Sequence, residues 1–103
     1  MYIVIFVTAS NKKEAEKIAC ALIEEKLAAC ANIIENLHSI FWWQGKVDNT
    51  KEALLIVKTR KALMNKLIKK VKSLHSYKVP EIIALPIICG DKKYLKWINE
   101  STN

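Results

Sequence analysis

The sequence predicts a single α+β domain, in which a four-stranded antiparallel sheet with one long hairpin is combined with helices in the order βαββαβ plus a C-terminal helix. Three observations predict this class. Apolar runs with the period of strands alternate with runs that have the period of helices, and one Gln-Gly turn divides a long extended region. Hydrophobic residues make up 51% of the chain, with only two glycines and two prolines, which is typical of an ordered globule. A length of 103 residues allows one domain, residues 1–103.

The first strand and helix are marked by a change of period. Residues 2–8 form a β-branched and aromatic run that is apolar on both faces, which favours a central strand. Asn11, with Glu14 three residues later, resembles a capping box. Apolar residues then recur at helical spacing, so the sequence predicts a helix from this cap to about Lys26.

A long hairpin follows. An extended region covers about Ala29–Trp43, and the return strand runs from about Lys46 to Thr59. Gly45 supplies the positive φ that a tight turn between them needs. Residues 48–50, Asp-Asn-Thr, weaken the start of the return strand and indicate a bulge or a second bend there.

The second half repeats the pattern of helix and strand. Thr59 is expected to cap a helix whose apolar stripe runs from Leu63 to Leu74. A fourth strand is expected over Val79–Cys89, and because Pro86 cannot donate a ladder hydrogen bond, this strand should lie at an edge or bulge. Asp91 should cap the short last helix. The whole order is the ferredoxin-like split βαβ arrangement.

The hairpin is too long for one subunit. A domain of this size is roughly 35 Å across, whereas 15 extended residues approach about 50 Å. The overhanging tip would expose an apolar segment, residues 40–43, on both faces of the ribbon. We therefore expect other copies of the chain to cover it. The alternative is that the strand bends near Glu35-Asn36 and folds the tryptophans onto its own core.

The positive charge is confined to one element. The net charge is +7, and residues 60–78 contain seven basic residues and no acid. A basic helix over Arg60–Lys72 keeps open a second function, the binding of nucleic acid or another anion. Against nucleic acid, the motif of RNA-binding ferredoxin-like domains is absent, and the central strands have Leu, Ile and Val where stacking aromatics would be needed.

The cysteines and the chain's hydropathy indicate a cytoplasmic protein. The three cysteines have no Cys-x-x-Cys spacing, so they are expected to be reduced thiols and not a zinc or dithiol motif. No leader pattern and no apolar stretch of membrane-spanning length is present. No nucleophile motif, phosphate loop or metalloprotease motif is present either, so we do not expect an enzyme or a required cofactor.

Five short motifs resemble one known family, the CutA divalent-cation tolerance proteins. The match covers nearly the whole chain, with the motifs in the family's order and spacing. They are Leu27-Ala28-Ala29-Cys30-Ala31-Asn32, Trp43-x-Gly45-Lys46, Glu52-x-x-Leu55-x-x-Lys58-Thr59, His75-x-Tyr77-x-x-Pro80-Glu81-Ile82 and Tyr94-Leu95-x-Trp97. The resemblance implies a ferredoxin-like subunit in a tight homotrimer joined by long hairpins, an architecture related to the PII signalling proteins, and a role in tolerance to copper and other divalent metals.

The chain departs from the family at positions that bear on metal binding. Ser76 stands where the family usually has Pro, and Gln44 where Glu is common. Val7 and Leu74 occupy positions where the family's assigned metal ligands are Cys and His, so only His75 of that set remains. Copper(I) favours thiolate and imidazole ligands, which makes Cys30 and His75 the candidate metal ligands. The competing interpretation of Cys30 is packing in an apolar strand.

The remaining candidates are polar residues of the motifs and the aromatic residues. Glu52, Lys58, Tyr77 and Glu81 would line a cleft between subunits and hold a small anion or a metal, or Lys58 and a carboxylate would form an interface ion pair. The tryptophans could stack a ligand, but such residues are enriched in interface cores, which favours an interface. The predicted interface residues are Phe41, Trp42, Trp43 and Trp97.

Overall fold

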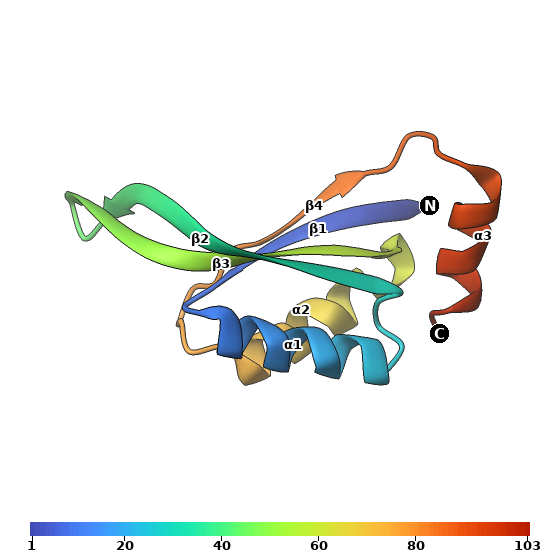
Figure 1. The fold of residues 1–103 in the computed structure, drawn as a ribbon, viewed down its shortest axis with the longest axis horizontal. Helices are drawn as coiled ribbons and strands as arrows, with labels where there is room; N and C mark the ends of the chain where they lie inside the picture. Colours follow the sequence, from blue (N-terminus) through green and yellow to red (C-terminus); the bar gives the residue numbers. More distant parts are fainter.

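The chain folds into four strands, three α-helices and a short 3₁₀ turn, in the predicted order (Figure 1). The structure is a computed structural model that describes residues 1–103. None of its helices combines the length and the apolar character needed to cross a bilayer. The elements are β1 (Tyr2–Ala9), α1 (Lys12–Glu24), β2 (Cys30–Trp43), β3 (Lys46–Arg60), the 3₁₀ turn (Lys61–Leu63), α2 (Met64–Leu74), β4 (Ile82–Pro86) and α3 (Lys92–Glu100).

The sheet has the strand order β2-β3-β1-β4, and every neighbouring pair is antiparallel. This confirms the predicted fold class and the central place of β1. Strand β4 lies at an edge, as Pro86 indicated, but it covers only Ile82–Pro86 of the predicted Val79–Cys89. Pro80 and Pro86 bracket the strand, and because proline has no N–H, neither can donate to the ladder with β1.

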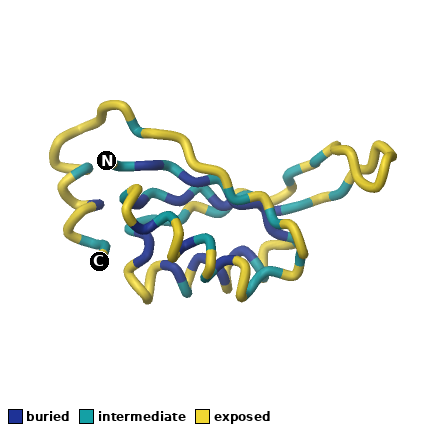
Figure 2. Tube along the Cα trace, turned by 180° about the vertical axis from the view of Figure 1, so that it is seen from behind, coloured by how far each residue is buried: buried dark blue, intermediate teal, exposed yellow.

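Helices α1 and α2 cover one face of the sheet and leave the other open (Figures 1 and 2). The covered face contributes alternate strand residues such as Ile5 and Val57, which pack with helical residues such as Leu22 and Leu67 into one buried cluster. On the opposite face, the cross-strand partners Phe6 and Ile83 are only partly buried or exposed. One apolar face of the sheet therefore has no partner within the subunit.

The hairpin extends beyond the rest of the sheet. Strand β1 pairs with β3 only as far as Ala53, whereas β2 and β3 stay paired to Trp43 and Lys46 (Figure 1). The longest dimension of the subunit is 44 Å against 25 and 23 Å for the others. Trp42 at the tip is 74% exposed. The predicted overhang is confirmed, and the alternative of a hairpin folded onto its own core is wrong.

The irregularity of the hairpin lies in β2 near Glu35-Asn36, where the alternative placed a bend, and not at residues 48–50. The register shifts between Ile34 and Leu37, and Asn36 has a φ of 59°. Asparagine tolerates this left-handed conformation better than most residues, which explains why the bulge forms there. At the tip, Gln44 and Gly45 both have positive φ, at 50° and 76°, as a two-residue turn with the twist of the strands requires.

Two of the three predicted helix caps are confirmed. Asn11 Oδ1 accepts a hydrogen bond from the Glu14 N–H at 2.8 Å, and Asp91 Oδ2 accepts one from the Tyr94 N–H at 3.0 Å. The prediction for Thr59 is wrong. Its side chain faces the core from β3, is fully buried, and donates to the Leu27 carbonyl at 2.7 Å. Strand β3 continues past it, and the 3₁₀ turn precedes α2.

Candidate functional site

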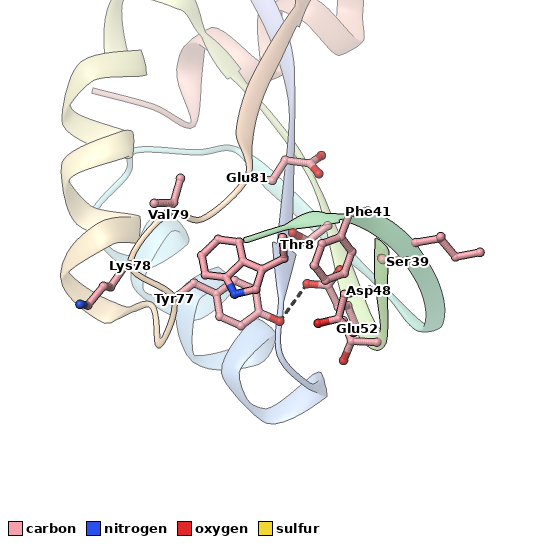
Figure 3. A pocket seen from close by; sticks show the side chains of 12 residues that line it. Thr8, Ser39, Phe41, Asp48, Glu52, Tyr77, Lys78, Val79 and Glu81 are labelled. Atoms are coloured by element: carbon pink, nitrogen blue, oxygen red, sulfur yellow. Dashed lines mark hydrogen bonds between the residues drawn. The ribbon is translucent and has the colours of Figure 1, made fainter. Parts of the chain in front are cut away.

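A groove of about 740 Å³ lies where the hairpin leaves the sheet, between the ribbon and the loop that joins α2 to β4 (Figure 3). Strand alternation explains its hairpin wall. Ser39, Phe41 and Trp43 lie on one face of β2, and the cross-strand partners of the first two, Thr50 and Asp48, lie on the same face of β3. The lining combines aromatic side chains with carboxylates: Phe41, Trp43, Tyr77, Asp48, Glu52 and Glu81.

Tyr77 and Glu52 are joined within the groove. The Tyr77 hydroxyl donates a hydrogen bond to Glu52 Oε2 at 2.9 Å (Figure 3). Burial, followed by the bond to the Glu52 carboxylate and the charge of Glu14, raises the pKa of Tyr77 to about 12. The phenol is therefore a stable neutral donor, and its proton keeps the Glu52 carboxylate oriented.

His75 supports the turn that carries Tyr77. Its side chain is fully buried, Nε2 lies 2.7 Å from the Thr8 carbonyl oxygen, and Nδ1 lies 3.0 Å from the Tyr77 backbone nitrogen. A carbonyl can only accept and a backbone N–H can only donate, so these two contacts fit the tautomer that carries its proton on Nε2. Both ring nitrogens are engaged, which leaves neither with a free lone pair for a metal in this conformation.

Glu14 ties this turn to the start of α1. Its carboxylate accepts hydrogen bonds from the Ser10 N–H and hydroxyl, at 3.0 and 3.1 Å, and from the Ser76 N–H at 3.0 Å. Burial acts to raise the pKa of Glu14, but these hydrogen bonds outweigh it and hold the pKa below its ordinary value. The charged carboxylate therefore links the α2–β4 loop to the helix α1.

A second polar cluster lies at the opposite end of the hairpin. Cys30 faces Lys58 across the strands, and the Lys58 ammonium donates to Asn32 Oδ1 and lies 3.9 Å from the Cys30 sulfur. Burial first, and then the neighbouring Cys30, raise the pKa of Tyr94. Cys30 is half-buried among polar groups on the open face of the sheet, so the interpretation that it packs as a small hydrophobe in an apolar strand does not describe its surroundings.

The structure divides the predicted site residues between these two places. Glu52, Tyr77 and Glu81 meet in the groove, whereas Lys58 lies six residues further along β3, about 20 Å away at the rise of a strand. Lys58 therefore forms no part of the groove in its own subunit.

The two candidate metal ligands are also separated within one subunit. Cys30 lies opposite Lys58 on β3. His75 bonds to Thr8, and Thr8 lies opposite Leu54, which is four residues before Lys58 on the same strand. That separation is about 13 Å along the strand. No three His, Cys, Asp or Glu side chains lie close enough to hold a metal ion together.

The remaining predicted residues also occupy separate places. Val7 is buried in the core and Leu74 packs against it, so neither faces a site. Trp97 stacks with Tyr94 at 5.4 Å between ring centroids in α3, away from the aromatic residues of the hairpin. The sequence reasoning missed Asp48 as a groove residue. Its position opposite Phe41 in the predicted hairpin was the signal that could have found it.

Comparison with known proteins identifies the family. The family model described as CutA1 divalent ion tolerance protein matches residues 3–101. The divalent-cation tolerance protein CutA of Thermus thermophilus is 50% identical over 99 residues, which cover 96% of each chain. The chloroplastic protein CutA 1 of rice is 50% identical over 100 residues, 97% of this chain and 56% of the rice protein. The chain thus spans little more than half the length of the plant relatives that it matches.

Solved structures agree with this result. The divalent cation tolerance protein of Thermus thermophilus superposes with a TM-score of 0.98 at 48% identity, over 100% of both chains. The protein described as the periplasmic divalent cation tolerance protein CutA of Archaeoglobus fulgidus superposes with a TM-score of 0.95 at 46% identity, over 98% of both chains. Sequence, fold and the position of the motifs agree, and the chain belongs to the CutA1 divalent ion tolerance family.

Proposed function

We propose that this protein contributes to divalent-cation tolerance as a homotrimer that acts by assembly and binding and not by catalysis. The observation that supports this is the open apolar face of the sheet, together with the projecting hairpin. Exposed residues of the open face include Ile34 on β2 and Ile83 and Leu85 on β4, and Trp42 is exposed on the other face of the hairpin, at its tip. Monomeric proteins rarely expose apolar patches this extensive, so the simplest explanation is that other copies of the chain cover this surface.

The two free edges of the sheet favour a ring. Strands β2 and β4 each have one side without a partner strand. A contact between the β2 edge of one subunit and the β4 edge of the next is heterologous, and such contacts close into a ring when the rotation between subunits allows it. The resemblance to the CutA family suggests that the ring contains three subunits.

Sedimentation tests this assembly directly. The expected species at micromolar concentration has about three times the 11.8 kDa mass of one chain. A folded species of single-chain mass at that concentration would refute the proposal, because the open face would then be stable in water.

Copper binding is the more specific part of the proposal. Of the two predicted ligands, Cys30 is the one that is available to bind a soft metal, because both nitrogens of His75 form hydrogen bonds within the subunit. A site that uses both residues would have to draw them from different subunits. Titration of copper(I) into the wild type and the Cys30→Ser variant should show weaker binding to the variant. Equal binding would remove Cys30 from the site and favour the other form of the proposal, a metal-independent signalling trimer like the PII proteins.

The basic surface of α2 supports a second candidate function, the binding of a nucleic acid or another anion. Lys66, Lys69 and Lys72 are exposed, and among the lysines of this helix only Lys70 forms a salt bridge, with Glu25 at 2.7 Å. The helix lies on the covered side of the sheet, so the basic surface and the open sheet face point in opposite directions (Figure 1). RNA binding by the sheet face, as in RNA-recognition domains, would therefore not use these lysines. If no RNA binds at about 50 mM salt, this candidate is excluded.

The cytoplasm is the compartment that we propose for the protein, from the character of its cysteines. Relatives carry names that place them in the chloroplast and the periplasm, so the family as a whole occupies several compartments. Fractionation of cells that express the full-length gene product tests this directly. Recovery of the protein with periplasmic or organellar markers would contradict the proposal.

A further inference from the structure

The groove has the composition of a site for a cation. Three of the chain's ten acidic residues, Asp48, Glu52 and Glu81, line it together with the rings of Phe41 and Trp43. The only basic residue in the lining is Lys78, and its ammonium points away from the aromatic and acidic side chains (Figure 3). In a protein with a net charge of +7, carboxylates and aromatic rings thus lie together in one groove.

The aromatic walls distinguish between kinds of cation. A small metal ion prefers several oxygen ligands at close range, and no three acidic or other ligating side chains of this chain converge in that way. An alkylated ammonium differs, because its methyl or methylene groups contact apolar walls while its charge is attracted by ring faces and carboxylates. We propose that the groove binds a small organic cation, a substituted ammonium compound, between the aromatic residues Phe41, Trp43 and Tyr77 and the carboxylates of Glu52 and Glu81.

The dimensions and construction of the groove agree with such a ligand. Its volume of about 740 Å³ falls in the range of small-molecule sites in proteins. The bond between Tyr77 and Glu52 holds two of its walls in place. Every lining residue belongs to the same subunit. Because Phe41 and Trp43 are also predicted interface residues, the neighbouring subunit of the proposed trimer would border the groove, so ligand binding has to be measured on the assembled protein. Trp42 lies on the other face of the ribbon and stays available for assembly.

A pair of matched probes tests the charge requirement. Choline and its neutral isostere, in which a carbon atom replaces the quaternary nitrogen, are titrated into the full-length protein in the presence of a metal chelator, with calorimetry and tryptophan fluorescence as readouts. We expect choline to bind about tenfold more tightly, which corresponds to one or two cation–π contacts plus the carboxylates. Equal affinity would show an apolar pocket only. No binding of choline up to about 10 mM would show that the groove is closed to ligands. Either result would overturn the proposal.

Variants then assign the site. Glu52→Gln keeps an acceptor for the Tyr77 hydroxyl but removes the charge, and Trp43→Leu removes an aromatic face, so each should weaken choline binding about tenfold and leave the isostere nearly unaffected. Glu100→Gln, in α3 at the far end of the molecule, is the matched control and should change nothing (Figure 1). The oligomeric mass and melting temperature of each variant establish that it is folded. Unchanged choline affinity in folded Glu52→Gln and Trp43→Leu variants would place the ligand elsewhere and refute the site.

Discussion

Trp42→Ala is the sharpest test of the idea that the hairpin tip is covered by other subunits. The indole is 74% exposed in the isolated subunit. An aromatic side chain of this size buries roughly 200 Å², so complete cover would remove about 150 Å² from water, worth about 4 kcal/mol per subunit at ~25 cal/mol per Å². Allowing for incomplete burial, the change should cost about 2–4 kcal/mol per subunit, or about 6–12 kcal/mol for a trimer that buries three copies. The trimerisation constant should then fall by about four to nine orders of magnitude.

Sedimentation velocity over a dilution series measures this effect. The wild type should remain assembled at nanomolar concentration, whereas the Trp42→Ala variant should dissociate in the micromolar range. Lys66→Ala is the control, because Lys66 is exposed on α2, on the covered side of the sheet, and its loss should leave the mass unchanged. A Trp42→Ala variant that stays folded and sediments like the wild type throughout the dilution series would show that the tip is not part of the assembly.

Three further predictions concern the polar contacts that hold the subunit together. Thr59→Val preserves shape but removes the donor to the buried Leu27 carbonyl, so urea unfolding at fixed protein concentration should show a loss of about 1–3 kcal/mol, and no loss would mean that water replaces the donor. Tyr77→Phe removes the bond to Glu52 and should cost about 1 kcal/mol in the same assay, whereas an unchanged midpoint would show that this bond contributes nothing. The pKa of Glu14 is lower in the folded state than in the unfolded one, so its contribution to stability is present above about pH 4.5 and is lost as the pH falls further. Glu14→Gln should flatten this part of the pH–stability profile, and a profile identical to that of the wild type would contradict the role given to Glu14.

Local signals account for most of the fold that the sequence predicts. The apolar run at residues 2–8, the turn at Gly45 and the cap at Asp91 each depend on neighbouring residues alone, and all three are confirmed. The prediction for Thr59 failed because a threonine at a strand end can cap the next helix or face the core. Which of these two positions Thr59 takes depends on the pairing register of β3 with β1, which is set by the tertiary structure.

The candidate site was less accessible to sequence reasoning, for a related reason. Glu52 and Lys58 were predicted to line a cleft between subunits, and six residues of strand place them about 20 Å apart within one subunit, so a shared cleft would have to draw them from different subunits. Placing Tyr77 beside Glu52 requires the path of the loop between α2 and β4, which no local pattern encodes. The role of His75 likewise depends on the carbonyl of Thr8, 67 residues away in the chain.

Ser76 connects the departure from the family pattern to this loop. Where the family resemblance implies a proline, this chain has a residue with a backbone N–H, and that N–H donates to Glu14. A proline would remove the donor but would also lower the entropy of the unfolded chain, by about 0.4–1 kcal/mol in free energy. His75, the residue before it, has a φ of −83° and a ψ of 142°, a conformation that also suits a residue preceding proline. The backbone path is therefore compatible with either residue. With serine, the loop is held by a hydrogen bond to α1 that is charge-assisted when Glu14 is ionised and weaker when it is protonated, which is a pH-dependent contact that a proline would not provide.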